Sequence, residues 1–192
     1  MGRLSRPVLT TERLRLEPLT NDHTELLVEL DSDPEVLRFV FGRALTRAEV
    51  VEDWMPRRTR PDADARGLGY WSGFTRTPMP RFLGWWSLAV DDADPAAAEL
   101  GYRLRRDAWG LGYATEGARA LLSHAFGTVG LGRVWAETMA VNTGSRRVLE
   151  KCGLRHVLTE VREWDDPLPG AELGEVVYAV TRGEWAAGDA AG

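Results

Sequence analysis

The chain has 192 residues, 44% of them hydrophobic and 28% charged, which fits one globular domain with a sizeable core and is short for two. A formal net charge of −5 argues against a nucleic-acid-binding protein, and the single cysteine, Cys152, excludes an internal disulfide framework and a multi-cysteine metal site. No apolar run approaches the ~20 residues of a membrane span, and the first residues lack the apolar core of a signal peptide, so a cytoplasmic protein with no membrane partner is expected.

The first half of the chain reads as short strands and helices. In chain order, hydrophobic periodicity and capping residues predict a loose end over 1–9, an edge strand over 13–19 closed by Pro18, a helix from Asn21 or Asp22 to about Asp31, a helical turn over 35–40, and a helix over 47–58. Thr46 and Glu49 have the spacing of a capping box, which marks the start of the last of these helices.

The second half alternates strands with longer helices. Its predicted elements are strands over 70–75 and 82–90, a loop over 91–98, a strand over 99–105, a helix over about 114–126, a strand over 133–139, a helix over 143–151 stopped by Gly153, strands over 155–163 and 175–181 around a loop at 165–174, and a loose tail from about Ala186. This order implies a mixed α+β sheet with helices on its faces.

The first strand-to-helix junction of interest carries Gly110 and Gly112. Glycines let a main chain turn sharply and approach a ligand closely, and the first turn of the following helix has unpaired amides at its positive end. Such a junction suits a phosphate or pyrophosphate. A tight connection without a ligand is the alternative, because glycine turns are common.

The second junction carries Asn142 and Ser145. If Asn142 is the N-cap of the helix over 143–151, Ser145 lies one turn on at the same positive helix end, where developing negative charge is favoured. Basic side chains gather at both junctions of an otherwise acidic chain: Arg103, Arg105, Arg106, Arg146, Arg147 and Lys151. This local excess favours a polyanionic ligand, and solvated arginines on exposed faces are the alternative.

Three segments carry a family resemblance: TTERLRLEPLT, ELGYRLRRDAWGLGYATEGARALL and AVNTGSRRVLEKCGL. In this order they resemble the GCN5-related N-acetyltransferase (GNAT) superfamily, and within it the RimJ/RimL-type ribosomal-protein and small-molecule acetyltransferases. The resemblance covers about residues 8–185, so it implies a single acetyltransferase domain over 1–192. The implied fold is α+β, a mixed, mostly antiparallel sheet that splays between its central strands, with helices on both faces. A homodimer is in keeping with the family, which is often dimeric.

The resemblance also implies acetyl-CoA as co-substrate and no metal. The pyrophosphate is expected on the amides of residues 110–115, and the pantetheine arm on main chain near Leu104, in the splay. Trp109 stands where the family's loop has Gln or Arg, a place where the subgroup often carries an aromatic residue. The expected cofactor-binding residues are Leu104, Arg105, Trp109, Gly110, Leu111, Gly112, Tyr113, Ala114, Thr115, Asn142, Ser145 and Arg147.

Acetyl transfer to a primary amine by direct attack in a ternary complex needs a base, an oxyanion donor and help for the leaving thiolate. The amide near Leu104 is the expected oxyanion donor, and Ser145 the expected donor to the sulfur. Glu137 matches the position of the base in related enzymes, and Glu99 is a rival; either is alternatively an exposed strand carboxylate. Related enzymes place a tyrosine that acts as general acid at the position of Leu149. Another residue must therefore serve as the acid here, and Ser145 is the candidate. Asn142 is expected to cap the helix and to share in catalysis.

The acceptor is the least defined part of the prediction. A protein N-terminus and a small-molecule amine both remain open, as does a non-catalytic acyl-CoA-binding module of the same fold. A cationic amine suits the acidic residues near the last strand, which are otherwise a solvated face: Asp165, Asp166, Glu172 and Glu175. Trp85 and Trp86 must face opposite sides of their strand, so one belongs to the core and the other is a candidate pocket wall, as is Trp71.

Overall fold

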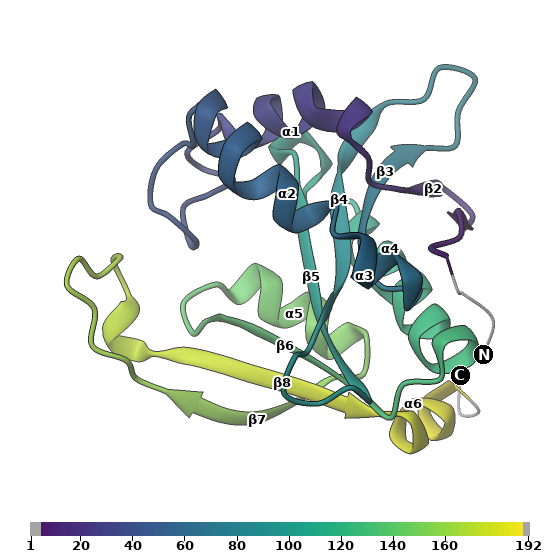
Figure 1. The fold of residues 1–192 in the computed structure, drawn as a ribbon. Helices are drawn as coiled ribbons and strands as arrows, with labels where there is room; N and C mark the ends of the chain where they lie inside the picture. The colour runs from purple at the N-terminus through teal and green to yellow at the C-terminus, as the bar shows by residue number, and fades with distance from the viewer. Residues whose placement is uncertain (1–4, 190–192) are drawn as a thin grey trace.

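Two apolar clusters lie on opposite faces of one eight-stranded sheet in the computed structural model, which describes residues 5–189. The larger cluster lies between the sheet and helices α4 (Tyr113–Ser123) and α5 (Thr143–Lys151). The smaller one lies under α1 (Thr24–Asp31) and α2 (Met55–Arg58). Figure 1 shows α1 and α2 together at one end of the sheet, on the side away from α4. The expected α+β fold with helices on both faces is confirmed.

The strands lie in the order β1-β2-β3-β4-β5-β6-β8-β7. Their bounds are β1 Leu9–Thr10, β2 Leu14–Pro18, β3 Gly69–Thr75, β4 Phe82–Val90, β5 Ala97–Leu104, β6 Arg133–Met139, β7 Arg155–Glu160 and β8 Glu175–Thr181. Among the described strands β5 and β6 form the one parallel pair. A long hairpin of β7 and β8 extends from this end of the sheet (Figure 1).

The sheet splays between β5 and β6, as expected. Their register runs from Ala97↔Arg133 only to Glu99↔Trp135, whereas β4 stays paired with β5 as far as Gly84↔Leu104. Residues 100–104 of β5 therefore have a strand neighbour on the β4 side and a gap on the β6 side. Backbone groups on that free edge are available to an extended ligand.

Most element boundaries follow the sequence pattern, and four of them coincide with it: β4, β6, α5 and β8. The observed boundaries differ from the predicted ones where backbone hydrogen bonds extend an element beyond its hydrophobic pattern. β5 begins at Ala97, inside the expected loop. The expected helix over 47–58 is helical throughout, with a π-helical stretch, Glu49–Trp54, before α2. Residues 35–40 form successive hydrogen-bonded turns, in agreement with the expected helical turn. The remaining short helices are Asn21–His23, α3 Pro61–Ala65, Arg106–Ala108, His124–Val129 and Ala171–Leu173.

Both chain ends are more ordered than expected. The side chain of Arg6 is 7% exposed and its Nε donates to Asp64 at 2.9 Å, while the Trp71 indole donates to the Pro7 carbonyl. At the other end, α6 (Arg182–Asp189) begins at a capping box of Thr181 and Glu184. The predicted loose ends are therefore wrong for 5–9 and 186–189, and 1–4 and 190–192 lie outside the described residues. Within 5–189, no helix is long and apolar enough to cross a membrane.

Candidate active site

The loop after β5 turns on glycines in left-handed conformations. Gly110 has φ +71° and Gly112, the N-cap of α4, has φ +85°, a region that other residues adopt only with strain. The Trp109 indole donates to the Leu104 carbonyl at 2.8 Å and holds the loop against the strand end. Within the described chain, no side chain caps the first turn of α4. Its N-terminal amides therefore have no side-chain partner at the cap, which is the arrangement that an anion site needs.

Arg13, at the start of the β2 segment, holds this loop from outside. Its Nη1 donates to the Leu111 carbonyl at 2.9 Å, its Nε donates to Glu116 at 2.6 Å, and its guanidinium lies 4.6 Å from the Tyr113 ring centre. Burial opposes ionisation of Glu116, but hydrogen bonds from Thr11 and Arg13 outweigh it and lower the pKa of Glu116. Arg13 was expected only as a strand residue, because its partners lie about a hundred residues away.

The second junction has the predicted local geometry. Asn142 Oδ1 accepts a hydrogen bond from the Ser145 amide at 3.1 Å, so Asn142 is the N-cap of α5, and Gly153 ends the helix with φ +83°. The Ser145 hydroxyl lies 3.0 Å from the phenol oxygen of Tyr102 on β5. This contact brings the start of α5 against the splayed part of β5.

The helices α4 and α5 also lie side by side. Arg119 of α4 donates to the Lys151 carbonyl of α5 at 2.7 Å, and the Cys152 thiol lies 3.7 Å from the Thr115 carbonyl. Cys152 is 1% exposed, and burial raises the pKa of its thiol to about 12, so the thiol packs as a core residue and is poorly suited to act as a nucleophile. The start of α4 therefore lies beside the C-terminal end of α5, while the Tyr102 contact places the start of α5 against β5.

The two candidate bases face the other side of the sheet. Side chains alternate along β5, so Glu99 points away from the face of Tyr102 and Ser145. Burial, followed by the charges of Glu137 and Asp91, raises the pKa of Glu99. Glu137 is held by Arg162, with two hydrogen bonds of 2.9 Å. Burial and the charge of Glu137 also raise the pKa of Glu175.

Most of the arginines at the junctions are paired with protein groups. Arg103 lies 2.7 Å from Asp31, Arg105 lies 2.6 Å from Glu29, and Arg106 lies 3.9 Å from Asp33. Arg146 donates to the Tyr178 hydroxyl and the Ala140 carbonyl. Acids of the α1 region therefore pair with Arg103, Arg105 and Arg106 and reduce the local excess of positive charge. Arg146 bonds neutral oxygens and keeps its charge. Arg147 and Lys151 are exposed on α5.

A buried charged cluster lies where α1 and α2 cover β4 and β5. Asp31 is 0% exposed and bonds both Arg58, at 2.9 Å, and Arg103, at 2.7 Å. Both guanidiniums stack on Trp85. Desolvation lowers the pKa of Arg103 in spite of Asp31. Trp85 therefore packs in this cluster, while Trp71 and Trp86 are fully buried in the larger core and are not pocket walls.

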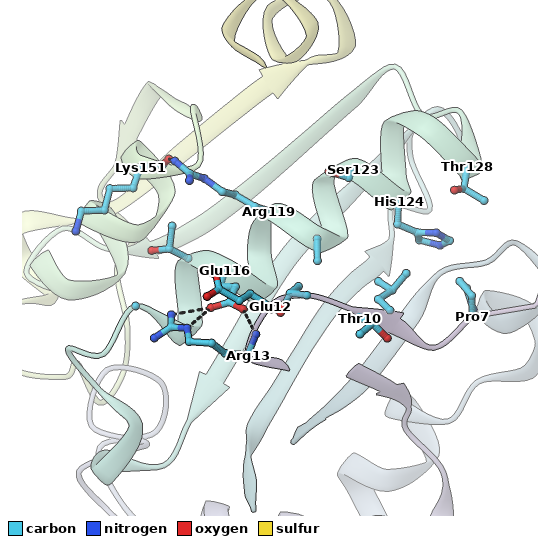
Figure 2. Close-up of a pocket in the computed structure, with 15 residues that line it drawn as sticks. Pro7, Thr10, Glu12, Arg13, Glu116, Arg119, Ser123, His124, Thr128 and Lys151 are labelled. Atoms are coloured by element: carbon cyan, nitrogen blue, oxygen red, sulfur yellow. Dashed lines mark hydrogen bonds and ion pairs between the residues drawn. The ribbon is translucent and has the colours of Figure 1, made fainter. Parts of the chain in front are cut away.

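An open cavity of about 960 Å³ runs along the outer face of α4 (Figure 2). Gly112 and Thr115 of the expected cofactor site line it, whereas Ser145, Asn142 and Glu137 do not. Arg119 and Lys151 lie near one another toward one end, and His124 and Thr128 lie at the other. The cavity therefore borders the start of α4 and includes no residue of β5 or β6, where the acetyl-transfer chemistry is expected.

The helical region 21–60 and the loop 165–175 approach each other. A Cβ placed on Gly42 would lie 2.5 Å from the Leu168 side chain, so the loop before α2 touches the loop before β8. The histidines have no metal-site arrangement: His124 bonds the Gly67 carbonyl and His156 bonds Thr159. Across residues 5–189, no group of three or more potential metal-ligating side chains is found.

The acetyltransferase (GNAT) domain family model matches residues 13–155. This match covers both junctions and the splayed strands between them. The chain belongs to the GNAT acetyltransferase family. It is accordingly an acetyl-CoA-dependent N-acetyltransferase.

Relatives of this GNAT chain include a protein of Aspergillus fumigatus named FsC-acetyl coenzyme A-N(2)-transacetylase. The two are 41% identical over 191 residues, which covers 94% of this chain and 79% of the relative. Among solved structures, spermidine N-acetyltransferase from Vibrio cholerae, in complex with CoA and spermine, has a TM-score of 0.74 and 14% identity over 92% of this chain and 99% of its own. RimL, a ribosomal L7/L12 alpha-N-protein acetyltransferase in complex with CoA, has a TM-score of 0.74 and 17% identity over 91% and 98%. These two structures support the fold.

Three residues at the GNAT site were missed by sequence reasoning: Arg13, Tyr102 and Arg162. Each bonds a residue distant in the chain, and for Arg13 and Arg162 neither spacing nor composition marks that residue. For Tyr102 a signal existed, because it alternates with Glu99 along β5 and must face the helices if Glu99 faces away.

Proposed function

We propose that this protein transfers an acetyl group from acetyl-CoA to a cationic primary amine, of a small molecule or a protein N-terminus, by direct attack in a ternary complex. The observation that carries the proposal is the placement of Ser145 on one face of the β5–β6 splay and of Glu99 and Glu137 on the other. An amine approaching from the acidic face meets a base, and the thiolate leaves toward a hydroxyl at a helix start. The name of the Aspergillus relative, which specifies acetyl-CoA and an N(2) nitrogen, supports a nitrogen acceptor.

The residues of the first junction fit the nucleotide end of acetyl-CoA. The uncapped first turn of α4 and the open side of Gly110, where a Cβ would meet nothing within 4 Å, suit a pyrophosphate on the amides of residues 110–115. Arg119 and Lys151 supply cations beside the bordering cavity. Arg147 is exposed and free to contact a phosphate, whereas Arg105 must exchange Glu29 for it. Bound acetyl-CoA supplies the thioester that the amine attacks.

A few groups are proposed to carry out the acetyl transfer. The Leu104 amide lies in the part of β5 beyond its pairing with β6 and is the proposed oxyanion donor, while the Leu104 carbonyl accepts from the Trp109 indole. Asn142 holds the first turn of α5, and Ser145 donates a hydrogen bond to the departing sulfur. Glu137 is the proposed base. Glu99 is the alternative, because a raised pKa brings a carboxylate closer to the basicity that proton abstraction near neutral pH requires.

The test is acetyl transfer by the purified chain. Acetyl-CoA is incubated with a panel of amines (polyamines, amino-acid esters and peptides with free N-termini), free thiol is measured, and products are identified by mass spectrometry. Thiol release with an N-acetylated product is the expected result. CoA binding measured by calorimetry together with no thiol release from any amine would favour the non-catalytic acyl-CoA-binding alternative.

A further inference from the structure

The phenol of Tyr102, on β5, contacts the start of α5. The Tyr102 hydroxyl oxygen lies 3.0 Å from Ser145 Oγ and 3.0 Å from the Ser145 carbonyl oxygen. Tyr102 belongs to the part of β5 that has lost its β6 neighbour, two residues before Leu104. The contact therefore joins the proposed sulfur-facing hydroxyl to the proposed acyl-binding strand.

The hydrogen atoms of this contact have two arrangements. The phenol carries one hydrogen and faces two acceptors, while the serine hydroxyl carries one hydrogen of its own. In the first arrangement Tyr102 donates to the Ser145 carbonyl and accepts from Ser145 Oγ. In the second, Tyr102 donates to Ser145 Oγ, which frees the serine hydrogen. No heavy atom has to move between them, and burial raises the pKa of Tyr102, which keeps its proton in place as a donor.

We propose that Tyr102 is a positioning residue that presents the Ser145 hydrogen to the departing sulfur. The inference rests on the proposed function of Ser145. In the acyl-transfer step the amine nitrogen forms the C–N bond, the C–S bond breaks with its electron pair on sulfur, and the ammonium proton passes to the carboxylate base. Ser145 turns its hydrogen to the thiolate while Tyr102 moves its own hydrogen from the carbonyl to Ser145 Oγ. The thiolate takes its final proton from solvent, and both hydroxyls keep their protons.

The experiment compares Tyr102→Phe, Ser145→Ala and the double variant, with Tyr178→Phe as the matched control. Tyr178 is also a buried tyrosine whose hydroxyl bonds α5, through Arg146 and Glu150, but it contacts none of the proposed catalytic groups. We expect Tyr102→Phe to lower kcat about tenfold, the size of one lost hydrogen bond, with CoA affinity unchanged and Tyr178→Phe at wild-type kcat. In the Ser145→Ala background, Tyr102→Phe should cause no further loss.

The outcomes separate the two proposals. A lowered kcat in Ser145→Ala with wild-type kcat in Tyr102→Phe overturns the inference and leaves the role of Ser145 standing. An equal loss from Tyr102→Phe with and without Ser145 also overturns it, since a structural effect would persist without the hydroxyl. Wild-type kcat in Ser145→Ala overturns both. If Tyr102→Phe does not fold, 3-fluorotyrosine at position 102 keeps the shape, and its effect on kcat must disappear in Ser145→Ala.

Discussion

Arg162 lies flat against Glu137, with Nη1 2.9 Å from Oε1 and Nη2 2.9 Å from Oε2. The same guanidinium donates to Glu160, and its hydrogen bonds to Glu137 and then to Glu160 raise the pKa of Arg162. Arg162 follows β7, at the start of the loop expected to border the acceptor. In the free protein, the guanidinium of Arg162 therefore hydrogen-bonds both oxygens of Glu137, the proposed base.

Replacement of Arg162 by glutamine should strengthen the binding of the acceptor amine. A cationic amine that approaches Glu137 must compete with the guanidinium, and both groups are partly exposed, so the gain is modest. We expect Arg162→Gln to lower the KM for a cationic amine by about threefold to tenfold with little change in the KM for acetyl-CoA. Arg155→Gln, at the opposite end of β7 and paired with Glu184, is the control. A raised amine KM in Arg162→Gln would mean that Arg162 supports the acceptor rather than competing with it.

Ser145→Ala and Glu137→Gln should each reduce turnover and spare cofactor binding. The base is expected to contribute about 100-fold or more, and the sulfur-directed hydrogen bond about tenfold. Steady-state kinetics with calorimetric CoA binding give both quantities, and CoA affinity should stay within a few-fold. Unchanged turnover in both variants would remove these two assignments. If Glu99→Gln loses turnover while Glu137→Gln does not, Glu99 is the base.

The raised pKa of Glu99 should make the stability of the fold depend on pH. Because its pKa is raised in the folded state, the ionised carboxylate is disfavoured by folding, and this penalty grows as pH rises above the ordinary pKa through the raised value. Glu99→Gln removes the penalty, so its Tm should exceed that of the wild type by roughly 2 °C at neutral pH. Below the ordinary pKa of glutamate the difference should vanish. Thermal melts across that pH range test the sign, and an advantage that grows toward acid would contradict it.

Local signals in the sequence predicted the backbone of the site. The Asn142 cap, the Gly153 stop and the Thr46–Glu49 box each depend on residues within a few positions, and the structure has all three. Side-chain pairing across the fold was not predictable from one sequence. Ser145 bonds Tyr102 across 43 positions, and Asp31 bonds Arg103 across 72. Many acids of similar local context were available to each arginine, so counting arginines at a junction overstated the free charge.

Removal of the Asp31 charge should destabilise the fold strongly. It is fully buried between Arg58 and Arg103, so Asp31→Asn leaves two guanidiniums facing each other in a desolvated cluster against Trp85. Removal of one member of a buried ionic group costs about 3–5 kcal/mol, because the remaining charge keeps its desolvation penalty and loses its partner. Chemical denaturation should show this loss, while Asp62→Asn, which breaks an exposed pair with Arg60, should change stability little. Since Arg103 lies on β5 one residue before Leu104, the variant should also lower turnover at temperatures where it is still folded. Wild-type stability in Asp31→Asn would show that the asparagine amide satisfies both arginines and that the cluster does not depend on a charge.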